Sequence, residues 1–91
     1  RSLKNEKLRT SAERLANWIL SADAQQGHQR NIELAFEKRT LASSLGMTPE
    51  NLSRNLALLA KYGVRSSGRN IIIEDSTALE RFAKPNSLID G

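Results

Sequence analysis

Apolar residues recur at every third or fourth position between residues 10 and 24, which is the spacing that gathers side chains on one face of a helix. Thr10 and Glu13 have the spacing of a capping box, in which both side chains satisfy backbone groups at a helix start. We therefore expect the first helix to begin near Thr10 and to form the hydrophobic base of a domain. Residues 1–9 are either the end of an earlier helix or a hinge. The apolar face comprises Ala12, Leu15, Ala16, Ile19 and Ala22, flanked by Trp18 and Leu20.

The pattern changes to alternation after a polar stretch that contains Gly27. Polar and apolar residues alternate across residues 31–36, as they do in a strand with one buried face. Ile32, Leu34 and Phe36 are predicted to point into the core.

Two short helices are predicted on either side of Gly46. The first spans residues 38–45 and stops at Gly46, which readily adopts the left-handed conformation common at helix ends. Thr48 suits the N-cap of the next helix, and Pro49 suits its first turn. That helix should run to about Lys61. Such a tight connection is typical of a helix-turn-helix, although helical hairpins with a glycine turn also occur in ordinary cores.

The C-terminal third predicts a hairpin and a last helix. Residues 64–66 and 70–73 have strand character and flank turn residues at 67–69. Residues 75–77 offer caps for a short helix that closes before Pro85. The expected fold is mostly α with a small β-hairpin, a winged helix-turn-helix with a three-helix core. The domain should occupy residues 10–84, followed by a tail at residues 85–91.

Composition limits what this domain can do. Its 91 residues have a net charge of +4, and a chain this short has room for one core but not for a deep catalytic cavity. The longest apolar run, residues 56–60, falls short of the roughly 20 residues of a membrane helix. Cysteine is absent, which excludes disulfides and thiolate metal sites and is usual in the cytoplasm. His28 lies in a polar loop without an obvious partner, and no nucleophile elbow or phosphate-binding glycine loop is present. We therefore expect no enzyme, no metal and no cofactor.

Positive charge is concentrated in the middle of the chain. Residues 38–69 contain six cations and one anion, Glu50, whereas the remaining residues are close to neutral. This basic region is either a solvated surface or a footprint for a polyanion such as nucleic acid.

The helix predicted to begin at Pro49 has two distinct faces. At about 100° per residue, Glu50, Ser53, Arg54 and Lys61 share a polar face. Arginine can donate two hydrogen bonds to guanine, glutamate can accept from cytosine, and serine can bond to bases or phosphate. Glu50 and Arg54 are also spaced for a surface salt bridge, so the spacing alone leaves both interpretations open. The opposite face is a leucine stripe, Leu52, Leu56 and Leu59, that we expect to be buried.

The run from Lys38 to Arg54, together with the predicted hairpin, resembles the C-terminal winged-helix DNA-binding domain of Crp/Fnr-family bacterial transcription regulators. Its most specific part, Glu50-x-x-Ser53-Arg54, matches the Fnr-like branch, whose members bind TTGAT-type palindromic half-sites. The Crp branch has arginine and glycine where this chain has Pro49 and Ser53. The resemblance implies that Arg54 contacts guanine, Glu50 the cytosine of a base pair and Ser53 a thymine.

The same resemblance implies the partners. Double-stranded DNA is the expected ligand, the full-length protein is expected to be a homodimer through N-terminal parts that precede Arg1, and RNA polymerase is a further candidate. An effector would bind a sensor outside this sequence. The alternatives are a winged-helix module that docks an acidic protein and a non-specific nucleic-acid binder, against which Glu50 argues because a carboxylate repels phosphate. Side chains expected to contact the DNA backbone, or else to be plain surface, are Arg39, Thr40, Ser44, Lys61, Arg65, Ser67 and Arg69.

Overall fold

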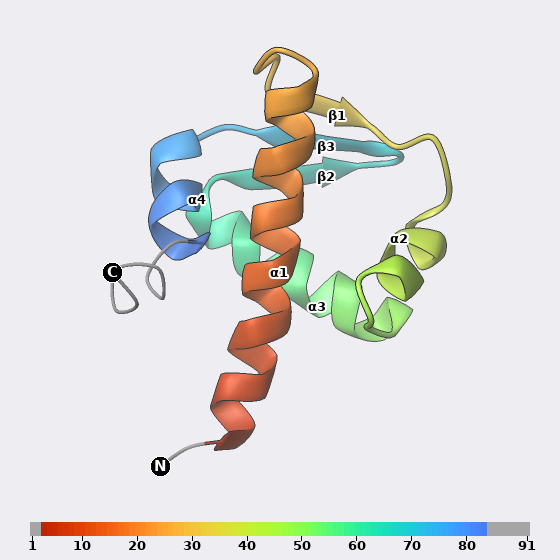
Figure 1. Cartoon of the computed structure of the whole chain (residues 1–91), viewed down its shortest axis with the longest axis vertical. Coiled ribbons are helices and arrows are strands. Elements are labelled where there is room, and N and C mark those ends of the chain that lie inside the picture. Colours follow the sequence, from red (N-terminus) through yellow and green to blue (C-terminus); the bar gives the residue numbers. More distant parts are fainter. Residues whose placement is uncertain (1–2, 84–91) are drawn as a thin grey trace.

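A computed structural model of the chain describes residues 3–83, and side chains from residue 11 onward. Within these residues, four α-helices and a small three-stranded antiparallel sheet form the predicted winged helix-turn-helix. In Figure 1, α1 lies across the front of the molecule with the sheet at its C-terminal end, and α3 crosses behind it. The elements are α1 (Leu3–Gln25), β1 (Asn31–Glu33), α2 (Lys38–Ser44), α3 (Pro49–Leu59), the 3-10 turn η1 (Ala60–Tyr62), β2 (Val64–Ser67), β3 (Asn70–Ile73) and α4 (Ser76–Ala83). Among the helices described, none is both long and apolar enough to cross a membrane.

The first helix begins at Leu3, so the prediction of a start near Thr10 is wrong. Residues 3–9 contain neither glycine nor proline and consist mainly of good helix formers, so nothing interrupts the helix before Thr10. The capping-box spacing therefore falls inside a continuous helix. Ser11 and Glu13, which would lie in an exposed first turn, are instead buried.

The hydrophobic core lies between α1, α3, the sheet and α4. Four residues of the predicted apolar face of α1 are buried: Ala12, Leu15, Ala16 and Ile19. Ala22 is only partly buried against the core, as are the flanking Trp18 and Leu20. The leucine stripe of α3 closes the core from the other side. The largest side chains with almost no exposed surface are Leu15, Ile19, Leu41, Leu52, Leu59, Ile71 and Leu79.

The sheet has the strand order β1-β3-β2, and both pairings are antiparallel. Ile32 and Leu34 are buried as expected, but Phe36 is 38% exposed and does not join the core. The chain leaves the sheet after Glu33 and bends toward α2, so the alternation of a strand no longer determines the direction of Phe36. The prediction for Phe36 is therefore wrong.

The helix-turn-helix forms where the sequence predicts it. Gly46 has a φ of +73°, and the Thr48 hydroxyl accepts a hydrogen bond from the Asn51 amide at 3.1 Å. Pro49 occupies the first turn of α3, where its missing N–H leaves no helical bond unmade. The α-helix ends at Leu59, slightly earlier than predicted, and η1 carries the chain to Gly63.

The hairpin and the last helix also agree with prediction. Gly68 and Arg69 form the turn between β2 and β3, and the φ of +58° at Gly68 suits the two-residue turns that join twisted strands. The Asp75 carboxylate caps α4 by accepting from the Ala78 amide at 3.1 Å. The predicted closure at Pro85 lies outside the described residues.

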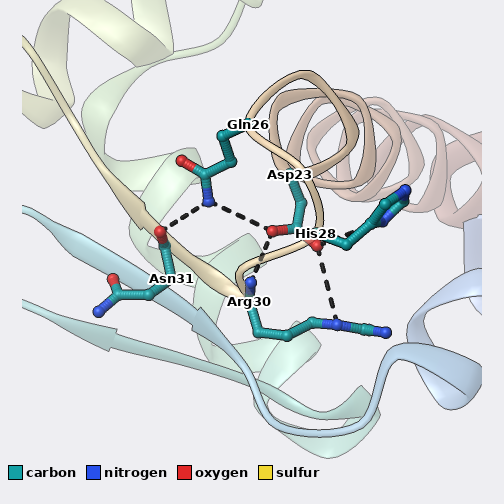
Figure 2. Close-up of polar contacts among 5 residues, drawn as sticks. All are labelled: Asp23, Gln26, His28, Arg30 and Asn31. Atoms are coloured by element: carbon teal, nitrogen blue, oxygen red, sulfur yellow. Dashed lines mark hydrogen bonds and ion pairs between the residues drawn. The ribbon is translucent and has the colours of Figure 1, made fainter.

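A buried carboxylate fixes the turn from α1 into β1 (Figure 2). Asp23 accepts hydrogen bonds from the Arg30 amide at 2.7 Å and from the Gln26 side chain at 3.3 Å. Gln26 also donates to the Asn31 carbonyl at 2.7 Å. His28 and Arg30 both have positive φ. The Nδ1 atom of His28 lies 3.8 Å, and the Nε atom of Arg30 lies 3.9 Å, from the same Asp23 carboxylate oxygen. These contacts offset the unfavourable backbone conformations and fix the end of α1 to the start of β1 at the edge of the sheet.

Candidate nucleic-acid interface

The exposed face of α3 carries the three side chains that the sequence predicts for base recognition. Glu50, Ser53 and Arg54 are all exposed, whereas the leucine stripe on the opposite face is buried. The stripe packs against α1 and the rest of the core, so burial fixes which side of the helix faces outward.

Glu50 and Arg54 do not form the salt bridge that their spacing permits. Among the side chains of residues 11–83, neither the Glu50 carboxylate nor the Arg54 guanidinium has an ion-pair partner. A carboxylate and a guanidinium one helical turn apart are thus both available to a ligand. That arrangement fits recognition of a G·C base pair, in which guanine accepts and cytosine donates.

The side chains expected on α2 differ in what they can offer a phosphate. Arg39 and Thr40 are exposed near the start of the helix, although Arg39 is paired with Glu37 at 3.2 Å. The Ser44 hydroxyl donates to the Leu41 carbonyl at 2.9 Å. A hydroxyl has one hydrogen to donate, so among the three side chains predicted on α2, Arg39 and Thr40 keep a donor for phosphate.

The wing contributes a second group of polar side chains. Ser67 and Arg69 are exposed at the tip of the hairpin. Arg65 is exposed as well, but its Nε lies 2.9 Å from a carboxylate oxygen of Glu74. An acidic side chain therefore competes with phosphate for Arg65.

Lys61 and Lys38 lie where the sequence pattern alone does not place them. Lys61 is exposed in η1, beyond the end of α3. The α-helical spacing that predicts a shared face for Lys61 and Arg54 therefore ends before it reaches Lys61. Lys38 at the start of α2 donates a hydrogen bond to the Ser66 hydroxyl of β2. This bond joins the first helix of the helix-turn-helix to the wing. Only the basic character of Lys38 was visible in the sequence.

Comparison with known proteins agrees with this geometry. Residues 13–82 match the model of the Crp-like helix-turn-helix domain. The chain belongs to this family. It is 31% identical to the nitrogen fixation regulation protein FixK of Azorhizobium caulinodans, over 81% of this chain and 33% of the relative. The family found by comparison therefore agrees with the resemblance seen in the sequence. The relatives of this Crp-like domain are transcription regulators rather than enzymes.

Solved structures give the same result for the Crp-like domain. FixK2 of Bradyrhizobium japonicum superposes with a TM-score of 0.68 at 27% identity, over 79% of this chain and 37% of FixK2. A regulatory protein of Silicibacter pomeroyi DSS-3 that is named for cAMP binding gives a TM-score of 0.69 at 32% identity, over 81% of this chain and 32% of that protein. The chain therefore spans about a third of the length of these relatives.

Proposed function

We propose that this Crp-like domain binds double-stranded DNA in a sequence-specific manner and that α3 enters the major groove. The observation that carries the proposal is that Glu50 and Arg54 are exposed, and have no ion-pair partner among the described side chains, on a helix whose other face is buried. In helix-turn-helix proteins the second helix contacts base edges through residues near its N-terminus. Glu50, Ser53 and Arg54 lie in the first two turns of α3.

The half-site is proposed to be of the TTGAT type. In this proposal Arg54 donates to guanine O6 and N7, Glu50 accepts from the amino group of a cytosine, and Ser53 contacts a thymine. Glu50 supports specific over non-specific binding, because a carboxylate facing DNA is unfavourable unless a base donor meets it.

The remaining polar side chains are proposed to hold the DNA backbone. Arg39 and Thr40 would act from α2, Lys61 from η1 after the recognition helix, and Ser67 and Arg69 from the wing. Phosphate contacts of this kind set the register of the protein on DNA but do not select a sequence.

The whole protein is proposed to be a cytoplasmic transcription regulator. A palindromic site implies a homodimer, whose two recognition helices meet half-sites about one helical turn apart. Dimerisation and effector binding would then belong to parts of the protein outside this domain, and contact with RNA polymerase would decide its effect on transcription.

Fluorescence anisotropy tests the proposal directly. The domain is titrated onto a duplex with paired TTGAT half-sites and onto a scrambled duplex of the same composition, at two salt concentrations. We expect tighter binding to the TTGAT duplex at both salt concentrations. Equal and steeply salt-dependent binding to both duplexes would indicate a non-specific polyanion surface. No binding at low salt, tested also with two domains fused as a dimer, would favour a protein-docking module.

Removing the acidic partner of Arg65 should strengthen binding to every duplex. Glu74→Gln releases the guanidinium from its 2.9 Å ion pair and removes one negative charge from the wing. We expect the affinity for both duplexes to rise by a similar factor, about two- to fivefold at low salt. The slope of log affinity against log salt concentration should steepen by about one, because one more phosphate is neutralised. Anisotropy titrations across a salt series measure both quantities.

Glu80→Gln provides the matched control for this experiment. Glu80 is an exposed carboxylate on α4 and lines the same surface pocket as Asp23 and Arg30. Its substitution changes the net charge by the same amount. If both variants changed affinity equally, the effect would come from net charge alone and not from Arg65.

A further inference from the structure

Asn55 is the polar side chain of α3 that faces inward. It is 1% exposed and follows Arg54 directly in the chain. Its amide nitrogen donates to the Ser11 hydroxyl of α1 at 3.1 Å and lies 3.4 Å from the sulfur of Met47. Asn55 therefore joins the recognition helix to α1 and to the turn of the helix-turn-helix at one point.

This arrangement is unfavourable for stability alone. The Asn55 side-chain oxygen is buried and has no hydrogen-bond partner within the described part of the chain. A buried acceptor without a partner incurs its full desolvation cost, and replacing a buried polar pair by apolar groups of the same shape can be neutral or stabilising. The leucines that surround this position on α3 show that an apolar side chain suits the same interface.

The Asn55 amide fixes the rotation of α3 about its own axis relative to α1. Leucine side chains pack in several similar arrangements, so a leucine stripe alone permits α3 to roll slightly on α1. A directional bond at 3.1 Å does not permit that roll. A second bond across the same region, from the Arg14 guanidinium to the Leu45 carbonyl at 3.1 Å, ties α1 to the end of α2. Buried polar groups fix register in this way in other helical assemblies.

We propose that Asn55 is a positioning residue for DNA recognition, which sets the roll of α3 through Ser11 and thereby directs Arg54 and Glu50 toward the bases. The proposal rests on the DNA-binding function proposed above. Asn55 itself does not touch DNA, because its side chain is buried between α1 and the turn.

Two substitutions separate positioning from stability. Asn55→Leu keeps the branching of the side chain and replaces both polar atoms by methyl groups. Removal of the unpartnered oxygen offsets the lost bond to Ser11, so the melting temperature should change little. Ser11→Ala removes the oxygen acceptor and leaves the amide with only the weak sulfur acceptor of Met47, so the melting temperature should fall. We expect both variants to lose cognate preference, with the ratio of scrambled to cognate Kd falling about three- to thirtyfold, as for residues that tune a site without touching its ligand. A ratio that followed the melting temperature would instead show that Asn55 is only structural.

Asn17→Leu is the matched control. It makes the same chemical change on α1, but the Asn17 side chain bonds to the Ala83 carbonyl of α4 and not to the helix-turn-helix. We expect its cognate ratio to equal that of the unaltered domain.

The orientation of α3 is measured independently of DNA. Residual dipolar couplings of the free domain give the angle of α3 relative to α1, and we expect Asn55→Leu to shift or average the couplings of α3 while those within α1 stay unchanged. Couplings identical to those of the unaltered domain would overturn the positioning role, whatever the DNA result. Absence of cognate preference in the unaltered domain would overturn the proposed function, and with it the role of Asn55 in recognition.

Discussion

Replacing Arg54 with alanine should remove most of the preference for the TTGAT duplex while leaving the fold intact. Arg54 is exposed and has no hydrogen-bond or ion-pair partner for its side chain among the described residues, so its loss removes no such bond from the free domain. Loss of a bidentate arginine contact to guanine costs about 1 to 3 kcal/mol on the cognate site. Anisotropy on cognate and scrambled duplexes measures the preference, and thermal melting checks the fold.

Two further variants distinguish base recognition from charge. Arg54→Lys keeps the positive charge but loses the planar pair of donors, so we expect it to bind both duplexes with little preference. Arg81→Ala removes an exposed arginine from α4 and should leave the preference unchanged. If Arg54→Ala weakened binding to cognate and scrambled DNA equally, Arg54 would be a phosphate contact and not a base contact.

Gly63→Ala should destabilise the domain strongly. Gly63 has a φ of +87°, and a Cβ at this position would lie 2.5 Å from the Asp75 Cβ and 2.7 Å from the Asp75 backbone nitrogen and oxygen. Backbone atoms cannot move aside as a flexible side chain can, and the Gly63 carbonyl also accepts from the Glu74 amide at 2.6 Å. We expect a loss of about 2 to 5 kcal/mol in the free energy of unfolding, from backbone strain and overpacking together. Urea denaturation measures this loss.

The chain offers a control in which the strain is present without the steric conflict. Gly27 has nearly the same φ, +85°, but a Cβ there would meet nothing within 4 Å. Gly27→Ala should therefore cost only the strain of a left-handed alanine, about 1 to 2 kcal/mol. Equal losses for the two variants would show that close packing against Asp75 contributes little.

Local chemistry explains why much of the fold could be predicted from the sequence. Thr48 and Pro49 define the start of α3 through short-range capping, and Gly46 and Gly63 end helices through positive φ. The helical period of the leucine stripe determines which face of α3 is buried, and hence that Glu50, Ser53 and Arg54 are exposed. These features need only a few neighbouring residues to be specified.

Features that depend on distant residues could not be predicted. The start of α1 was wrong because a capping box competes with a favourable helical segment, and spacing alone does not decide the outcome. Phe36 was wrong because alternation says nothing about where a strand stops. The Arg65 pair with Glu74 and the Asn55 bond to Ser11 join residues 9 and 44 positions apart. The sequence contained no periodic or capping signal for either contact.

The strand order has a consequence for contacts between copies of the domain. β3 contains three successive isoleucines, the kind of short β-forming run that promotes aggregation when it is exposed. It lies in the middle of the sheet, and both of its backbone edges are occupied by β1 and β2. The edge strands are only three and four residues long and present the exposed charges of Glu33 and Arg65. Short charged edges oppose strand addition, so the sheet offers a second copy no apolar edge on which to extend it.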